Sequence, residues 1–295
     1  MERQSWRLMD KQELELQYSP SRWTTRTGLG DAVEAHVQAL TEGTRRAQSL
    51  VRTVQDIQYG DTDSETMDMY LPAETHTGFP LLVYIHGGYW QLLSKEESGF
   101  LAPPLVSRGI AVMAMDYDIA PKGHMDLMVS QVRRSIAATL KLHPQITEVY
   151  LCGHSAGAHL AAMALSKDWS EYGVTPNVKG ALLVSGVYDL LPLLPTYVND
   201  PMNMTEEVAA RNSPMQCIME LKKNAASCHM AVVEAEHDSP EFRRQSRDFF
   251  QSLQSVGLPA SLQQVGDTDH FDVIERLSEE EYALTQGLLK MILGK

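Results

Sequence analysis

The chain has 295 residues, 43% of them hydrophobic and 21% charged, a composition typical of a globular protein with one large core or two modest ones. Its formal net charge of −13 disfavours a nucleic-acid surface and docking on an anionic membrane. The odd set of Cys152, Cys217 and Cys228 favours a reducing compartment over a disulfide framework. Residues 1–17 carry charges throughout, and no stretch is long and apolar enough to span a membrane, so we expect a soluble cytosolic protein.

The N-terminal part of the chain shows helical and then strand-like patterns. Apolar side chains recur with a helical period over residues 31–50, and strands are expected within 51–60 and 65–73, on either side of a turn at Gly60-Asp61. From residue 81 the pattern changes to short apolar runs that alternate with helical or loop segments. The expected strands lie at 81–87, 110–116, 149–153, 181–187, 230–236 and 261–266, and the expected helices at about 125–142, from Ser155, at 241–257 and at 279–293.

This alternation predicts an α/β fold with a mostly parallel central sheet and helices on both faces. No linker divides the chain, so we expect a single domain over 1–295. Two segments fall outside the alternation: residues 1–50, and residues 190–230, which are rich in Pro, Met and Asn. An insertion at 190–230 would lie over the carboxyl edge of the sheet, where ligands bind in open α/β folds. We therefore expect both segments to form a small cap.

The sequence GHSAG at 153–157 matches the G-x-S-x-G nucleophile elbow of the α/β-hydrolase fold, between an apolar strand and an Ala-rich helix. In such a corner the serine has a strained backbone, and glycines on both sides prevent clashes with the neighbouring strand and helix. The motif predicts Ser155 as a nucleophile exposed at a helix N-terminus. A Gly-Ser turn without chemical function is the alternative reading.

The sequence HGGYW at 86–90 follows directly after another apolar strand. Its two glycines allow backbone N–H groups to point into a cavity, as in the oxyanion hole of α/β-hydrolases. The expected donors are the amides of Gly88, Tyr89 and Ala156. A glycine turn that carries buried aromatic side chains is the alternative.

The chain order of this fold places the acid and then the histidine after the serine. Among His159, His229, His237 and His270, only His270 follows the last strand, so we expect it to be the general base. Asp238 follows the fifth apolar run on a short loop, and Ser239-Pro240 resembles a helix start, which would hold the carboxylate firmly. We expect Asp238 to orient His270.

Other assignments have less support. Asp189, one strand earlier, is the alternative acid, whereas Asp267 and Asp269 are too close to His270 in sequence to reach around it. A metal loop is the alternative reading of Asp267, Asp269, His270 and Asp272. No matching distant ligand or metal-site motif accompanies them, so we expect no metal and no organic cofactor. We expect Cys152 to be a buried small apolar side chain.

Together these stretches resemble the animal kynurenine formamidases, also called arylformamidases, over most of the chain. HGG-x-W is the more specific signature, because lipase-like relatives usually have a third glycine at the position of Tyr89. The matching stretches are YSPSRW at 18–23, HGGYW at 86–90, DYDIAP at 116–121, GHSAGAHLAA at 153–162, HDSP at 237–240 and DHFD at 269–272.

The resemblance implies hydrolysis of N-formyl-L-kynurenine to L-kynurenine and formate in tryptophan catabolism. It implies Ser155 as nucleophile, His270 as base and Asp238 as orienting acid. Members of this family are described as cytosolic, sometimes also nuclear, and often dimeric, so a homodimer is expected. A carboxylesterase for short acyl esters is the alternative enzyme, and a non-catalytic binding protein on the same fold is the alternative from another class.

Trp90 lies beside the expected oxyanion hole. A formyl group needs only a small acyl pocket, so we hypothesise that the Trp90 indole forms a wall of that pocket and contacts the substrate. Packing of this aromatic side chain in the core is an equally plausible interpretation.

Overall fold

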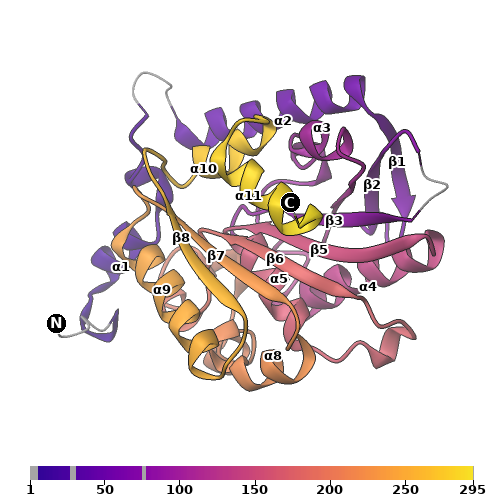
Figure 1. The fold of residues 1–295 in the computed structure, drawn as a ribbon. Coiled ribbons are helices and arrows are strands. Elements are labelled where there is room, and N and C mark those ends of the chain that lie inside the picture. Colours follow the sequence, from indigo (N-terminus) through magenta and orange to yellow (C-terminus); the bar gives the residue numbers. More distant parts are fainter. Residues whose placement is uncertain (1–5, 27–30, 75–77, 295) are drawn as a thin grey trace.

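The computed structural model describes residues 6–26, 31–74 and 78–294, and parts of the expected cap at 1–5 and 27–30 lie outside them. An eight-stranded sheet with the order β1-β2-β4-β3-β5-β6-β7-β8 forms its centre (Figure 1). β1 and β2 run antiparallel to their neighbours, and all later neighbours pair in parallel. The strands are β1 (Arg52–Gln58), β2 (Thr66–Leu71), β3 (Phe79–Ile85), β4 (Ala111–Met115), β5 (Ile146–His154), β6 (Val178–Val184), β7 (His229–Ala235) and β8 (Ala260–Val265).

Helices cover both faces of this sheet (Figure 1). The helices are α1 (Lys11–Gln17), α2 (Ala32–Leu50), α3 (Ala102–Val106), α4 (Met125–Leu142), α5 (Ala156–Ser166), α6 (Asn199–Met202), α7 (Glu206–Arg211), α8 (Ile218–Asn224), α9 (Pro240–Ser255), α10 (Asp272–Glu275) and α11 (Ala283–Leu293). The predicted mostly parallel α/β fold is therefore confirmed.

Successive side chains of the central strands pack alternately into two separate hydrophobic cores, one on each face of the sheet. In β3, Leu81, Val83 and Ile85 pack with α4, α5 and α9 on one face. Leu82 and Tyr84 pack on the opposite face with α2, α3 and α11. Because successive side chains in a strand point to opposite faces, a strand buried on both sides needs a continuous apolar run. This requirement explains the apolar runs in the sequence.

Capping side chains explain where two of the predicted helices begin. α2 begins after Asp31, whose carboxylate accepts hydrogen bonds from the amides of Val33 and Glu34. α9 begins at Pro240, and the Ser239 hydroxyl accepts from the amide of Phe242. Such caps satisfy amides that have no partner within the helix. The Ser-Pro helix start predicted beside Asp238 is thus confirmed.

The chain leaves β3 for β4 on one side of the sheet and later returns to place β5 on the other side. In open α/β sheets such a reversal of strand order creates a crevice at the carboxyl ends of the strands. The segments that follow β3, β5, β7 and β8 all emerge at this edge. They carry HGGYW, Ser155, Asp238 and His270 respectively.

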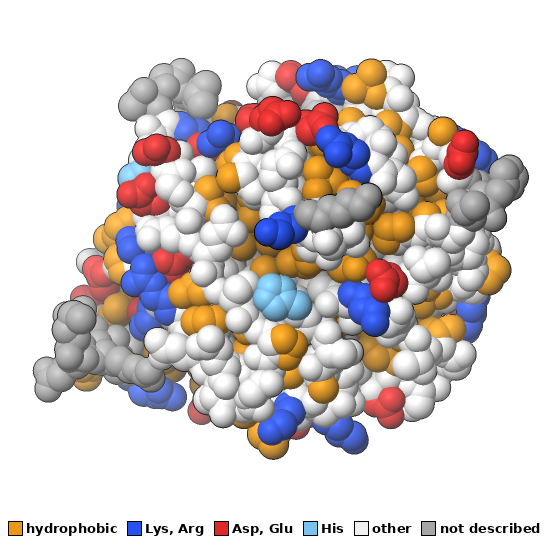
Figure 2. Space-filling view, viewed as in Figure 1, with side chains coloured by type: hydrophobic (Ala, Val, Ile, Leu, Met, Phe, Trp, Pro, Cys, Tyr) orange, Lys and Arg blue, Asp and Glu red, His pale blue; other side chains and the backbone are white. Residues whose placement is uncertain are grey.

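Charged side chains do not gather by sign on the face that carries α11. Figure 2 shows basic and acidic side chains interspersed over it. Within the described ranges, none of the helices is long and apolar enough to cross a membrane.

The turn from β5 into α5 depends on a very close approach to β3. A Cβ atom added to Gly157 would clash with the backbone carbonyl oxygens of Ile85 and His86, and one added to Gly153 would clash with the carbonyl of Gly157. Backbone atoms cannot move aside as the end of a flexible side chain can. The flanking glycines of the elbow are therefore required by packing.

We predict that Gly157→Ala lowers the free energy of unfolding by about 1–3 kcal/mol, because the added methyl group overpacks this contact. Gly287→Ala is the matched control, since Gly287 lies exposed in α11 with no atom within 4 Å of an added Cβ. Removing this helical glycine should raise the free energy of unfolding by about 0.5–1 kcal/mol. Urea unfolding of the two variants measures both changes, and equal stability of the two would contradict the packing argument.

Candidate active site

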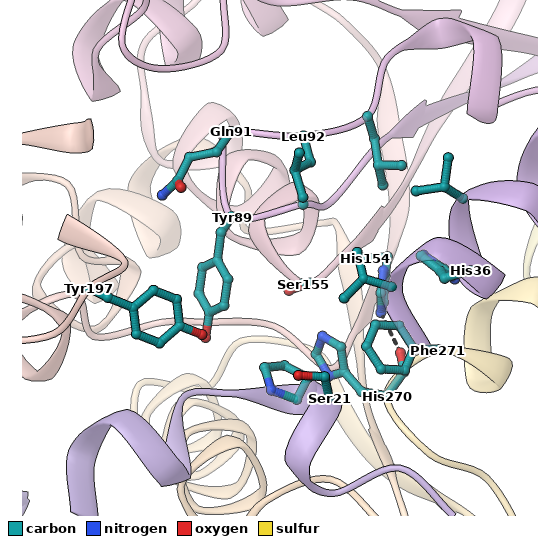
Figure 3. A pocket seen from close by; sticks show the side chains of 15 residues that line it. Ser21, His36, Tyr89, Gln91, Leu92, His154, Ser155, Tyr197, His270 and Phe271 are labelled. Atoms are coloured by element: carbon teal, nitrogen blue, oxygen red, sulfur yellow. Dashed lines mark hydrogen bonds between the residues drawn. The ribbon is translucent and has the colours of Figure 1, made fainter. Parts of the chain in front are cut away.

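A pocket of about 230 Å³ opens at the carboxyl edge of the sheet (Figure 3). Ser155, His154 and His270 contribute to its floor and one wall, and residues of the HGGYW loop contribute another wall. The N-terminal part of the chain also lines it, through Pro20, Ser21, Val33, His36 and Val37, and the 190–230 insertion adds Tyr197. The site is thus assembled from five separate parts of the chain.

Ser155 stands at the corner between β5 and α5. Its backbone has φ 54° and ψ −117°, a conformation that costs energy for a non-glycine residue. Its amide donates to the Val184 carbonyl at 2.8 Å, which holds the corner against β6. The side chain is almost fully buried but lines the pocket. The structure therefore gives Ser155 the strained placement that the elbow motif predicts.

His270 and Asp238 form a buried pair. The His270 Nδ1 atom lies 2.7 Å from Asp238 Oδ1. The other carboxylate oxygen, Oδ2, accepts hydrogen bonds from the Ser185 hydroxyl at 2.6 Å and from the Ala235 amide at 2.9 Å. A carboxylate with three donors is held in one orientation, and it assigns the Nδ1 proton to His270. The Nε2 atom of His270 is then left as the proton acceptor.

Ser155 and His270 line the same pocket, as Figure 3 shows. Among the hydrogen bonds of the described residues, none joins the Ser155 hydroxyl to His270. Catalytic hydrogen bonds in ligand-free enzymes are often long and tighten only when substrate binds. The three residues expected to act together are thus gathered at one place, with the Asp238–His270 contact already formed.

His154, the residue before Ser155, holds the loop that carries His270. Its Nε2 atom donates to the His270 carbonyl oxygen at 2.8 Å, and the two rings lie 4.8 Å apart. Burial lowers the pKa of His154 well below its usual value, and the nearby His270 and His36 lower it further. A neutral ring is thus maintained, with its Nε2 proton committed to this contact.

The HGGYW loop curls through three successive residues of positive φ: Gly88 at 86°, Tyr89 at 51° and Trp90 at 61°. A Cβ atom on Gly88 would also clash with the Leu92 carbonyl, so glycine is required there. The amides of Gly88, Tyr89 and Ala156 donate no hydrogen bond to any other described residue. Free amides in a strained loop beside the serine are what an oxyanion hole requires.

The DYDIAP stretch supports this loop from behind. The Tyr117 hydroxyl donates to the His86 carbonyl at 3.0 Å, and the Ala120 amide donates to the Trp90 carbonyl at 2.7 Å. The Tyr117 ring also stacks on the His86 ring at 4.2 Å. Burial lowers the pKa of His86 to about 4, so this imidazole remains neutral. HGGYW and DYDIAP, two of the stretches that carry the family resemblance, therefore pack against each other.

The structure corrects the hypothesis that Trp90 forms a wall of the acyl pocket. The Trp90 side chain is fully buried in the core and is not among the residues that line the pocket. Its indole packs edge-on against His159 at 5.0 Å. The positive φ of Trp90 turns its side chain inward, away from the cavity. The alternative, core packing, is therefore the correct interpretation of this residue.

The remaining candidates occupy other roles. The Asp189 carboxylate accepts from the Leu191 amide at 3.1 Å instead of contacting His270. His159 is buried and its Nε2 contacts the Asn212 carbonyl at 2.7 Å, so its ring is engaged in the core. Cys152 is fully buried, as expected. Within the described ranges, no group of three or more His, Cys, Asp or Glu side chains could hold a metal ion.

Sequence reasoning missed three parts of the site. Ser185 donates to Asp238 and follows β6 in the apolar run ALLVSGV. A polar side chain at the end of an apolar strand was the sequence feature that could have indicated its place in the site. Thr24 donates to Asp269 at 2.5 Å and Arg26 pairs with Glu275 at 2.9 Å, so the N-terminal segment is bound to the His270 loop. These long-range pairs left no pattern in the sequence.

The comparisons with known proteins agree with this geometry. The BD-FAE family model matches residues 67–253. Kynurenine formamidase from Danio rerio is 56% identical, with 97% of this chain and 98% of that protein covered. Kynurenine formamidase from Drosophila melanogaster is 30% identical, with 94% and 96% covered.

A solved structure from Silicibacter sp. TM1040 is 25% identical and superposes with a TM-score of 0.80, covering 93% of this chain and 98% of that one. Sequence relatives and structural neighbours thus agree over nearly the whole length. The chain belongs to the kynurenine formamidase family.

Proposed function

We propose that this protein hydrolyses N-formyl-L-kynurenine to L-kynurenine and formate. The observation that carries the proposal is the gathering of the Ser155 hydroxyl, the His270–Asp238 pair and three free amides in one pocket. Such a set of groups performs acyl transfer by a serine nucleophile. The full-length likeness to kynurenine formamidases supports this choice of acyl substrate over short esters.

In the first step, Ser155 Oγ attacks the formyl carbon while His270 Nε2 accepts the hydroxyl proton. Asp238 keeps the Nδ1 proton in place and stabilises the imidazolium that forms. The negative charge that develops on the formyl oxygen is taken up by the amides of Gly88, Tyr89 and Ala156. Each such donor contributes roughly 100- to 1000-fold to the rate.

In the second step, His270 returns the proton to the substrate nitrogen, the carbon–nitrogen bond breaks, and L-kynurenine leaves with its free arylamine. An arylamine leaves more easily than an alkylamine, so a serine nucleophile suits an aryl formamide. Water then attacks the formyl ester on Ser155, with His270 as the base, and formate is released as the serine regains its proton.

Apolar side chains of the pocket offer a surface for the aryl ring. Val33 and Val37 come from α2, Leu92 and Leu93 from the loop after HGGYW, and Phe271 from the loop of His270. A flat aromatic ring placed between them would bury apolar area on both sides.

We infer that the chain is a single domain in which the N-terminal segment and part of the 190–230 insertion cap this pocket. Tyr197 and Ser21 line it, and the Ser19 hydroxyl lies 2.9 Å from the Tyr197 hydroxyl, which joins the two segments. The remainder of the insertion, including α8, packs along α5. We further propose action in the cytosol, with the nucleus as a second location, and assembly as a homodimer. These proposals are supported by the family resemblance alone.

We predict that Ser155→Ala lowers kcat for N-formyl-L-kynurenine by ~10⁶-fold, to the background rate, because the nucleophile is lost. The same variant should lose labelling by a fluorophosphonate probe. The absorbance change on hydrolysis measures the first effect and gel fluorescence the second. Persistent labelling of the variant would mean that Ser155 is not the nucleophile. Faster turnover of a short nitrophenyl ester than of N-formyl-L-kynurenine by the unmodified protein would favour the carboxylesterase alternative.

We predict that Asp238→Asn lowers kcat by roughly 10⁴-fold, because the amide no longer holds the His270 tautomer that accepts a proton. Asp189→Asn is the matched control, since this carboxylate bonds to Leu191 and not to His270. The control should retain nearly full activity in the same absorbance assay. A larger loss of kcat in Asp189→Asn than in Asp238→Asn would mean that Asp189 orients His270.

A further inference from the structure

A second imidazole that lines the pocket, besides His270, is paired with a carboxylate. His36, on α2, lines the pocket (Figure 3). Its Nδ1 atom lies 2.6 Å from Glu275 Oε1. The ring is held on one side by Phe271 at 5.2 Å and on another by His154 at 5.9 Å. His36 is thus held by one carboxylate and two aromatic rings, yet the proposed reaction steps make no use of it.

The carboxylate decides which nitrogen of His36 is available. Glu275 Oε1 accepts a hydrogen bond, so Nδ1 carries the proton in this contact, and Nε2 is the ring nitrogen left to act as an acceptor. This Nε2 atom has no hydrogen-bond partner among the described residues. The other Glu275 oxygen, Oε2, accepts from the Arg26 guanidinium at 2.9 Å, so the carboxylate is held in one orientation. His36 therefore offers one hydrogen-bond acceptor to the pocket.

Three other polar side chains that line the pocket already donate to or contact the protein. The Tyr89 hydroxyl donates to the Tyr18 carbonyl at 2.8 Å, Gln91 Nε2 donates to the Val198 carbonyl at 2.8 Å, and the Tyr197 hydroxyl contacts Ser19. No Asp, Glu, Lys or Arg side chain is among the described lining residues. A ligand cation in this cavity therefore has to be bound by neutral acceptors such as His36 Nε2.

The charges behind His36 favour a cation in front of it. Glu275 and Asp269 share the single guanidinium of Arg26, at 2.9 and 3.4 Å. Asp272 adds a further carboxyl group next to Asp269; burial raises its pKa to about 6, so at neutral pH it is mostly ionised. Arg26 itself lies over the Phe271 ring at 5.6 Å and does not line the pocket. The net negative charge of this cluster attracts a positive group to the Nε2 side of His36.

We infer that His36 is a specificity-determining residue whose Nε2 atom accepts a hydrogen bond from the ammonium group of the substrate's amino-acid end. The inference rests on the proposed function, which supplies a substrate with a formamide at one end and an α-ammonium group at the other. The aromatic ring, a ketone and a methylene separate the two ends. With the formyl group at Ser155, the aryl ring would lie along the apolar wall and the ammonium group would reach α2.

The test compares four formamides with the unmodified protein and with His36→Leu. The formamides are N-formyl-L-kynurenine, its decarboxylated analogue, its deaminated analogue, and 2-formamidoacetophenone, which lacks both charged groups. His36→Leu should lower kcat/KM about 10- to 100-fold for the two substrates with an ammonium group, mainly through KM, since a hydrogen bond to a charged group is lost. The two substrates without it should react nearly as before.

A conservative variant separates binding from structure. In His36→Gln the carboxamide can donate to Glu275 and still present an oxygen to the ammonium group, so this variant should recover much of the lost kcat/KM. His143→Leu, at the end of α4 and outside the pocket, is the control and should leave all four substrates unaffected. Calorimetric binding of L-kynurenine should weaken in His36→Leu in parallel, and this measurement needs no turnover.

Two outcomes would overturn the inference. An equal loss of kcat/KM for all four formamides would mean that His36 only supports the fold of the pocket. A lower melting temperature of His36→Leu would accompany that result. A loss that follows the carboxylate instead of the ammonium group would mean that a protonated His36 binds the anionic end. If the unmodified protein fails to hydrolyse N-formyl-L-kynurenine, the proposed function itself fails, which is a different result from either of these.

Discussion

The contact of Gly157 with the end of β3 is the constraint on which the rest of the site depends. Because this glycine lets α5 begin against the backbone of Ile85 and His86, Ser155 can occupy its strained conformation at the sheet edge. The same contact brings the HGGYW loop beside the serine. The proposed nucleophile and the free amides are thus positioned by one close backbone contact, and the strain at Ser155 is offset by the buried cores on both sides of the sheet.

Histidines around the pocket have different roles because their neighbours differ. His86 and His154 are buried and contact no carboxylate of the described residues. Burial lowers the pKa of both rings and keeps them neutral, and each ring contacts a backbone carbonyl oxygen. His270 and His36 each contact a carboxylate through Nδ1, which leaves Nε2 available to the pocket. The residue type is the same in all four cases, and the neighbouring carboxylate decides which rings can act on a ligand.

The N-terminal segment completes a site that the hydrolase core leaves open. Thr24 and Arg26 bind the acidic residues around His270, and α2 places His36 and apolar side chains in the pocket wall. The core therefore supplies the proposed acyl-transfer groups, while a segment far away in sequence lines the region in which we propose that the rest of the substrate binds. This division explains how one fold can serve substrates as different as esters and aryl formamides.

The sequence alone determined the α/β alternation, the elbow at Ser155, the HGGYW loop and the choice of His270, because each depends on local spacing and chain order. It also favoured Asp238 over Asp189 through the Ser-Pro helix start. Only the tertiary structure decided that Trp90 packs inward, that Ser185 donates to Asp238, and that His36 contacts Glu275. Those facts depend on side-chain direction and on contacts between residues far apart in the chain, and neither leaves a periodic trace in the sequence.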